Sequence, residues 1–348
     1  ILSSDAEITV IGTADNGVEA IDAVARHKPD VVTMDIIMPE MDGYAATRRI
    51  METSPLPIVI VTSSLVKEEV DKTWRAVEAG AVAVLQKPGF FDRSGQGESG
   101  QKLIQTVKAM SQVKVVRRWA KTTPAPKVVH LPRTVVAPPP LPEAGPPPVP
   151  PLAPSRYEEV KIVAIGASTG GPTVLQSILC GLPGDFPVPV VVVQHISPGF
   201  TVGFVDWLNR SSSLTVHLAR NDQVALPGNA YVAPDGHQMK VDPKCKIQLT
   251  GDAQENGTRP SVSYLFRSVA HAFGKRAVGI LLTGMGKDGS AELKLMKDHG
   301  AVTIAQDKET SVVYGMPWEA VKLGGATYSL PPQKIIEMLQ RMVTRGKA

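Results

Sequence analysis

The stretch VKIVAIGASTGGP, residues 160–172, decides the fold of the C-terminal half of the chain. Its first six residues are almost all apolar, which is typical of a strand buried on both faces of a parallel sheet. Small residues and glycines follow, and Pro172 then stands where the first turn of a helix accepts a proline. A strand, a glycine turn and a helix in succession predict an open α/β sheet.

The same alternation continues toward the C-terminus. We expect further strands at residues 190–193, 214–218, 278–282 and 301–304. We expect helices to begin near Gly171, Phe200, Ser261, Gly289 and Pro317. The short runs 230–232 and 247–249 are expected to pair as a hairpin on one edge of the sheet.

The N-terminal half alternates in the same way. Apolar runs at residues 8–11, 31–34, 58–61 and 82–85 predict strands, and helical periodicity fills the gaps between them. Both halves are therefore expected to be α/β domains with doubly wound parallel sheets.

A proline-rich segment separates the halves. Thirteen prolines fall between Pro124 and Pro154, and such a run cannot donate enough backbone hydrogen bonds to join a helix or a sheet. We interpret it as a tether, although PxxP ligands of signalling domains have a similar composition. The expected domains are residues 1–112, a linker at 113–155 and residues 156–348.

The composition excludes several classes of protein. The net charge is only +4, so no large basic face for nucleic acid is indicated. The two cysteines, Cys180 and Cys245, form neither a disulfide framework nor a zinc motif, which favours a reducing, cytoplasmic setting. The longest apolar run is far shorter than the roughly 20 residues of a membrane helix, so direct membrane insertion is not expected.

Three polar residues stand just after predicted strands of the C-terminal half. They are Ser168, His195 and Asp288. Functional groups of open α/β sheets gather outside the carboxyl ends of the strands, so these three can converge on one rim. A serine hydroxyl needs a base to take its proton, histidine suits that task, and a carboxylate fixes the histidine tautomer. The pattern predicts a serine hydrolase.

Each feature also has another interpretation. The glycine loop 166–171 could cradle a phosphate, but it has neither the G-x-G-x-x-G spacing nor the G-K-[ST] ending. His195 alone could be a structural histidine, and Asp288 alone could cap the helix that follows it. The loop is not the G-x-S-x-G elbow of α/β-hydrolases, and the order Ser, His, Asp also differs from that class.

These motifs resemble the CheB chemotaxis methylesterases. The resemblance rests on residues 166–172, on Gln194-His195 and on LTGMGKDG at 282–289, and it spans about residues 157–342. It implies that Ser168 is the nucleophile, His195 the base and Asp288 the orienting acid, without a cofactor. It also implies that Thr169 supports the site and that the Met285 amide helps to bind the oxyanion.

The implied substrates are glutamyl γ-methyl esters on the cytoplasmic helices of chemoreceptors. Their hydrolysis yields glutamate and methanol, and deamidation of glutamine uses the same acyl chemistry. The resemblance therefore implies a cytoplasmic protein-glutamate methylesterase with protein-glutamine glutaminase activity, acting in the adaptation of bacterial chemotaxis.

The N-terminal half resembles a response-regulator receiver domain, which implies a flavodoxin-like strand order. Asp35 ends the strand in VVTMDIIMPEMDG, residues 31–43, which is the phosphoacceptor pattern. Thr62 matches the switch hydroxyl, and Lys87 matches the lysine of the family. A chemotaxis histidine kinase is the implied phosphodonor. Lys87 and Thr62 could donate charge-assisted hydrogen bonds to the negatively charged phosphoryl group on Asp35.

One departure from the receiver pattern concerns Mg²⁺. A receiver begins with a strand that ends in an acidic pair, whereas this chain opens at Ile1 and neither Asp5 nor Asp15 stands at an equivalent position. We therefore expect the first strand and helix to be missing and Asp35 to be the only metal ligand. The expected result is weak labelling of this chain by acetyl phosphate, and Mg²⁺-dependent phosphorylation of a full-length parent.

The two halves together suggest a regulator with two states. The unphosphorylated receiver would cover the rim around Ser168, and phosphorylation would release it. Two rivals remain open. One is a nucleotide-binding scaffold, which predicts tight nucleotide binding and no loss of function in Ser168→Ala. The other is a hydrolase that acts on a small ester.

Overall fold

The computed structural model describes residues 1–63, 67–89, 97–113, 115 and 160–344. The proline-rich segment lies outside these residues, so its expected tether conformation is not tested. Among the helices of the described residues, none is both long and apolar enough to cross a membrane.

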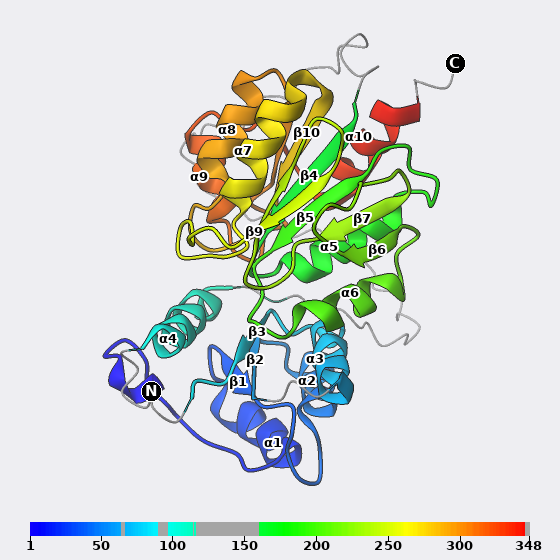
Figure 1. The fold of residues 1–348 in the computed structure, drawn as a ribbon. Helices are drawn as coiled ribbons and strands as arrows, with labels where there is room; N and C mark the ends of the chain where they lie inside the picture. The colour runs from blue at the N-terminus through cyan, green and yellow to red at the C-terminus, as the bar shows by residue number, and fades with distance from the viewer. Residues whose placement is uncertain (64–66, 90–96, 114, 116–159, 345–348) are drawn as a thin grey trace, which may run out of the picture.

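The N-terminal domain is built on a sheet of three parallel strands in chain order (Figure 1). They are β1 (Val32–Met34), β2 (Ile58–Thr62) and β3 (Ala83–Gln86). This is also the order of the last three strands of a flavodoxin-like sheet. A 3-10 turn, η1, covers Leu2–Ser4, and the helices are α1 (Gly17–His27), α2 (Gly43–Thr53), α3 (Lys67–Ala79) and α4 (Glu98–Ser111).

The two faces of this sheet are covered by different helices. Ile58 and Ile60 of β2 pack with residues of α1 and α2, whereas Val59 and Val61 pack with Leu103 and other residues of α4. This division follows from the alternation of side chains along a strand, and it confirms a strand buried on both faces.

The strand expected at residues 8–11 is wrong. These residues lie beside the sheet without joining it, and Val10 and Ile11 are 46% and 49% exposed. An apolar run forms a stable strand only when a neighbour supplies hydrogen bonds, and β1 pairs with β2 alone among the described strands. The apolar composition of the run could not predict the lack of a partner strand.

The C-terminal domain is built on seven parallel strands in the order β12-β11-β10-β4-β5-β7-β6. In this domain, every strand that we expected from an apolar run longer than three residues is present within two residues of its expected bounds. The strands are β4 (Ile162–Ala167), β5 (Val190–Gln194), β6 (Thr215–Leu218), β7 (Asn229–Val232), β10 (Ala277–Leu281), β11 (Val302–Gln306) and β12 (Tyr328–Leu330).

Helices cover both faces of this sheet, which gives three layers (Figure 1). Val163 and Ile165 of β4 face one helix layer, and Ile162 and Ala164 face the other. The first layer contains α5 (Gly171–Gly181), α6 (Thr201–Asn209) and α10 (Pro332–Thr344). The second contains α7 (Val262–Phe273), α8 (Ser290–Asp298) and α9 (Met316–Lys322), with the 3-10 turn η3 (Gly274–Arg276) after α7.

The expected hairpin between residues 230–232 and 247–249 is wrong. The first run belongs to β7, which lies parallel between β5 and β6. The second belongs to β9 (Ile247–Thr250), which pairs antiparallel with β8 (Gln238–Val241). The sequence QMKV of β8 has only a weak strand pattern, so the sequence did not predict β8 as the partner of β9.

The strand order reverses direction between β4 and β10. From β4 the chain continues to β5 on one side, whereas β10, β11 and β12 extend on the other side. Ligands of open α/β sheets bind at such a reversal, outside the carboxyl ends of the strands. Ser168 directly follows β4, so the fold puts it at this point.

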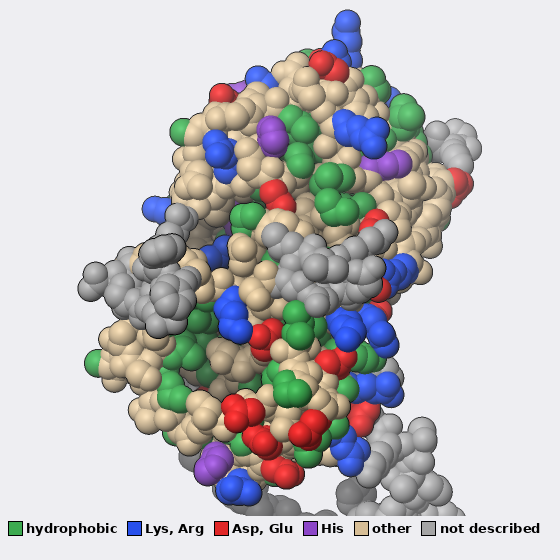
Figure 2. All heavy atoms as spheres, turned by 60° about the horizontal axis from the view of Figure 1, so that its bottom comes forward, with side chains coloured by type: hydrophobic (Ala, Val, Ile, Leu, Met, Phe, Trp, Pro, Cys, Tyr) green, Lys and Arg blue, Asp and Glu red, His purple; other side chains and the backbone are tan. Residues whose placement is uncertain are grey.

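The two domains meet where α3 packs against α6 (Figure 1). Trp74 of α3 is 1% exposed, and its ring lies 5.0 Å from Phe204 and 5.5 Å from Trp207 of α6. Gly203 permits this approach, because a Cβ there would lie 2.2 Å from Val70 Cγ1. Figure 2 shows the two lobes and a recess between them whose wall contains apolar side chains.

A Gly166→Ala substitution tests the packing behind the Ser168 turn. A Cβ at Gly166 would lie 2.2 Å from Cγ1 of the fully buried Val262, so the variant should lose about 1–3 kcal/mol of unfolding free energy in urea. Gly251→Ala is the control, since its Cβ would meet no atom within 4 Å. Equal stability of both variants would contradict this account.

Candidate active site

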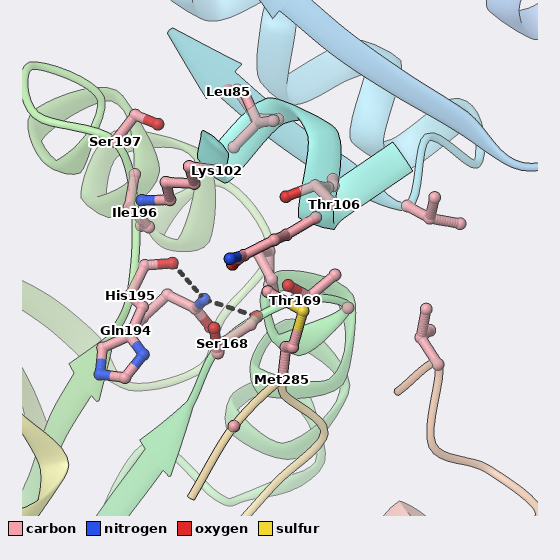
Figure 3. Close-up of a pocket in the computed structure, with 18 of the residues that line it drawn as sticks. Leu85, Lys102, Thr106, Ser168, Thr169, Gln194, His195, Ile196, Ser197 and Met285 are labelled. Carbon is pink, nitrogen blue, oxygen red and sulfur yellow. Dashed lines mark hydrogen bonds between the residues drawn. The ribbon is translucent and has the colours of Figure 1, made fainter. Parts of the chain in front are cut away.

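Ser168 and His195 lie side by side at the ends of neighbouring strands. Ala167 of β4 pairs in register with Gln194 of β5, so the next residue of each strand is also adjacent. The amide of His195 donates a hydrogen bond of 2.9 Å to the Ala167 carbonyl and fixes this arrangement. Figure 3 shows both side chains at the wall of one pocket.

The turn after β4 is held by hydrogen bonds on both sides of Ser168. Its amide donates to the carbonyl of Thr283 at 3.0 Å. Its carbonyl accepts from the Gly171 amide at 2.8 Å and from Gln194 Nε2 at 2.7 Å. Gly170 has a φ of 78°, which favours glycine, and α5 begins directly after it. The backbone that carries the serine is therefore rigid.

His195 is paired with Asp288. Its Nε2 atom lies 2.9 Å from Asp288 Oδ2, and the two side chains are only 12% and 4% exposed. A carboxylate accepts hydrogen bonds, so the proton of a neutral His195 ring resides on Nε2 and the lone pair on Nδ1. Among the described residues, no hydrogen bond joins Ser168 Oγ to His195. Such contacts often tighten only when substrate binds.

Asp288 accepts three hydrogen bonds at each carboxylate oxygen. Oδ1 accepts from Asn256 Nδ2, Ser261 Oγ and the Ser263 amide, at 2.8–3.1 Å. Oδ2 accepts from the Val262 amide at 2.7 Å and from Thr258 Oγ1 at 3.3 Å, in addition to His195.

Two of these donors, the Val262 and Ser263 amides, lie at the N-terminus of α7. The idea that Asp288 caps the helix following it is therefore wrong, because α8 starts after Gly289 without a side-chain cap, whereas the carboxylate caps α7 from outside.

These contacts lower the pKa of the Asp288 carboxyl group. Burial raises the pKa of its carboxyl group, but hydrogen bonds from His195, Ser263 and Ser261 and the charge of His195 outweigh burial. The resulting pKa lies well below the usual range of an aspartate. Asp288 therefore stays ionised at neutral pH, as a group that orients an imidazole must.

Two backbone amides near Ser168 can donate hydrogen bonds to a negatively charged oxygen. Within the described part of the chain, the amides of Thr169 and Met285 have no acceptor. Both residues line the same pocket as Ser168, and the N-terminus of α5 adds its positive dipole end. An oxyanion formed from a carbonyl beside Ser168 would find donors there.

The pocket has a volume of about 910 Å³ and is lined by both domains. Figure 3 shows Lys102 and Thr106 of α4 on one side, opposite Ser168, Thr169 and Met285. An adjoining hollow of about 580 Å³ has His195, Lys287 and Glu319 among its lining residues. The receiver-like domain thus forms part of the wall around Ser168.

The N-terminal domain gathers its own polar residues at the strand ends. Asp35 follows β1 closely, and Lys87 Nζ lies 2.7 Å from its Oδ2 atom. Thr62 ends β2, is 1% exposed, and accepts at its carbonyl a hydrogen bond from the Lys87 amide. The three residues expected at strand ends are therefore together, as their positions in the sequence predicted.

The described residues hold no cluster of metal ligands around Asp35. Among them, no group of three or more His, Cys, Asp or Glu side chains could hold a metal ion. Asp5 pairs instead with Lys108 of α4, at 3.3 Å, and Asp15 offers its amide to Glu19. Mg²⁺ is usually held by one or two carboxylates together with water and phosphate oxygens, and of these aspartates, Asp35 stands at the strand end beside Lys87.

Several residues that contact Asp288 were not predicted from the sequence. Asn256, Thr258 and Ser261 all hold Asp288, yet they lie about 30 residues before it. The Asn256-Gly257 pair signals a turn, and Ser261 signals a helix start, but neither signal indicates what the side chains contact. Only the three-dimensional fold identifies them.

Two family models match the chain. The model described as CheB methylesterase matches residues 163–339, and the response regulator receiver domain matches residues 1–94. These matches fall on the two domains of the structure.

Curated relatives match over almost the whole chain. A protein of Nitrosospira multiformis, named protein-glutamate methylesterase/protein-glutamine glutaminase, is 51% identical over 100% of this chain and 93% of its own length. A similarly named protein of Syntrophus aciditrophicus is 52% identical over 98% of this chain and 93% of its own length.

A solved structure supports the same assignment. The CheB methylesterase catalytic domain of Thermotoga maritima is 40% identical and has a TM-score of 0.51, and the match covers 53% of this chain and 99% of that domain. With the family model, the relatives and the solved domain in agreement, the chain belongs to the CheB methylesterase family and carries a response regulator receiver domain at its N-terminal side.

Proposed function

We propose that the chain is a protein-glutamate methylesterase that uses Ser168, His195 and Asp288 as its catalytic triad. Its substrates would be glutamyl γ-methyl esters on methyl-accepting chemoreceptors, and it would also deamidate selected glutamines. The observation that best supports this proposal is the buried His195–Asp288 pair, 2.9 Å apart, at the strand end beside Ser168. The names of the relatives agree with it.

The proposed reaction proceeds through an acyl-enzyme. His195 Nδ1 takes the proton of Ser168 Oγ as the oxygen attacks the ester carbonyl, and the Thr169 and Met285 amides donate to the oxyanion. Collapse expels methanol, which takes the proton from His195. Water then attacks the acyl group with the same base, releasing glutamate and free Ser168. Deamidation differs only in that ammonia leaves instead of methanol.

Asp288 serves this cycle by staying charged. Its carboxylate holds the Nε2–H tautomer, so that Nδ1 faces the serine, and it stabilises the imidazolium that forms during each proton transfer. The esterase steps use no metal ion.

The proposed control is phosphorylation of Asp35 by a chemotaxis histidine kinase, with Thr62 and Lys87 as the responding groups. Mg²⁺ for that transfer would need carboxylates besides Asp35. The proposed domain bounds are residues 1–112 and 156–348 with a linker at 113–155. A cytoplasmic location follows from this role, because kinase and receptor helices are reached from that side.

The receiver is proposed to inhibit the esterase by covering it. Support comes from the packing of α3 on α6 and from the pocket wall that α4 contributes opposite Ser168. An α-helix with its side chains is about 10–12 Å wide, and this wall stands on the side of the pocket opposite Ser168, where such a helix would have to approach. Phosphorylation would shift the population toward an open arrangement.

Loss of the nucleophile gives the primary test. Ser168→Ala should lower methanol release from methylated receptor membranes by at least about 1,000-fold, because no other group can form the acyl-enzyme. Ser177→Ala, on the exposed face of α5, is the matched control and should keep wild-type activity. Equal activity of wild type and Ser168→Ala, with tight nucleotide binding, would favour the scaffold alternative.

The charge of Asp288 gives a pH test. A depressed pKa in the folded state means that the charged carboxylate stabilises the fold above the ordinary carboxyl pKa of about 4, and that this stability is lost as the pH falls. Wild type should exceed Asp288→Asn in unfolding free energy at pH 7, and urea titrations should show the gap narrowing below about pH 4. A constant gap would refute this account of the charge.

The domain contact gives a test of inhibition. Trp74→Ala removes the side chain between Phe204 and Trp207, so methanol release should rise roughly three-fold or more as the open population grows. Arg75→Ala is the control, since Arg75 lies over the Tyr44 ring inside the receiver, 4.3 Å from its centroid. If Trp74→Ala and a cut in the linker both leave the rate unchanged, inhibition by covering is excluded.

A further inference from the structure

We propose that Thr283 is a positioning residue of the esterase, which fixes the distance between the Ser168 turn and the loop that presents the Met285 amide. This inference rests on the proposed function above. Thr283 follows β10 at the reversal of strand order, is fully buried, and has no exposed atom with which to touch substrate. Any contribution to the reaction must therefore act through its neighbours.

Thr283 is bonded to the Ser168 turn at two successive residues. Its carbonyl accepts from the Ser168 amide at 3.0 Å, and its Oγ1 donates to the carbonyl of Thr169 at 3.0 Å. Among the described residues, the Thr169 carbonyl has no other donor. Thr283 thus binds the backbone of Ser168 through its carbonyl and the backbone of Thr169 through its hydroxyl.

Thr283 is also bonded to a second segment, residues 311–314, which we call the strap. Its Oγ1 accepts from the Val313 amide at 2.9 Å, and the amide of Gly284 donates to the Val313 carbonyl at 3.0 Å. The Thr283 amide itself donates to Gln306 Oε1 at the end of β11. These bonds hold the backbone at Thr283 and Gly284 against the strap and against β11.

The side chain must be a hydroxyl to make this set of bonds. Oγ1 accepts from one amide and donates to the Thr169 carbonyl, with the Val313 carbonyl as a second acceptor at 3.2 Å. Serine preserves the donor and the acceptor, whereas valine has the same shape and neither. Valine would leave the Thr169 carbonyl and the Val313 amide without their partners.

The residues around Thr283 are packed too closely for the Ser168 turn to move freely. A Cβ at Gly284 would lie 2.7 Å from Ser168 Cβ, and a Cβ at Gly170 would lie 2.5 Å from Val312 Cβ of the strap. The backbone of Gly284 therefore lies against the Ser168 side chain, and the backbone of Gly170 lies against the Val312 side chain. A shift of the serine turn, the loop or the strap must move the Ser168 hydroxyl relative to the Met285 amide.

Catalysis is sensitive to such a shift. Donors of an oxyanion site act only when they lie about 2.7–3.1 Å from the developing oxygen. A displacement of about 1 Å can lower a rate by about 100-fold. The ground-state ester gains little from these donors, so a displaced amide should lower kcat and leave KM nearly unchanged.

The test compares Thr283→Val with Thr283→Ser in the full chain. Thr283→Val should lower kcat for methanol release by about 10- to 100-fold without a comparable change in KM, and Thr283→Ser should stay within about three-fold of wild type. Titration of Ser168 with a fluorophosphonate counts folded sites, so rates are expressed for each intact site.

Deamidation provides an independent readout. Both reactions use the same oxyanion, so Thr283→Val should lower ammonia release by about the same factor as methanol release. Wild-type kcat for each intact Thr283→Val site, or a change confined to KM, would overturn the proposal and leave Thr283 a purely structural residue. Absence of both activities in wild type would instead overturn the proposed function.

Discussion

The buried carboxylate of Asp288 is the interaction on which the rest of the site depends. Six donors surround it, and they come from the residue that follows β5, from the turn at residues 256–258 and from the start of α7. An unpaired charge at this depth would be costly, so the donors must be in place before the carboxylate is stable there. The same bonds that stabilise the charge fix the position of His195. The bonds that the fold needs at Asp288 are therefore the same bonds that the proposed triad would need.

Much of this arrangement could be predicted from the sequence, because short-range patterns determine it. Continuous apolar runs gave β4, β5 and β10, and the polar residues that follow them had to meet at one edge of a parallel sheet. The same reasoning placed Asp35 and Lys87 at one edge of the receiver sheet, and their side chains lie 2.7 Å apart there. Where a pattern was weak or a partner distant, as at residues 8–11 and in β8, the prediction failed, because strand pairing is a property of the assembled sheet.

The residues that hold Asp288 and the Ser168 turn in place could not be predicted from the sequence, for a related reason. Asn256 and Thr283 reach the site through contacts between segments far apart in the chain, and nothing in their local sequence specifies those contacts. A motif such as LTGMGKDG indicates that residues 282–289 form a functional loop, but it does not indicate which of them touch substrate. The structure separates Thr283, buried and bonded to backbone, from Met285, which lines the pocket.

The strap connects these observations to regulation. Val312 and Val313 pack against the apolar cluster that contains Leu103 and Val107 of α4, so the strap has the receiver on one side and the Ser168 turn on the other. A receiver that merely covered the pocket would need no such contact. Because the strap also bonds to Thr283 and Gly284, any repacking of α4 changes the support of the serine turn as well as access to it. If the receiver covers the site and Thr283 positions it, as proposed, one short segment would couple the two effects.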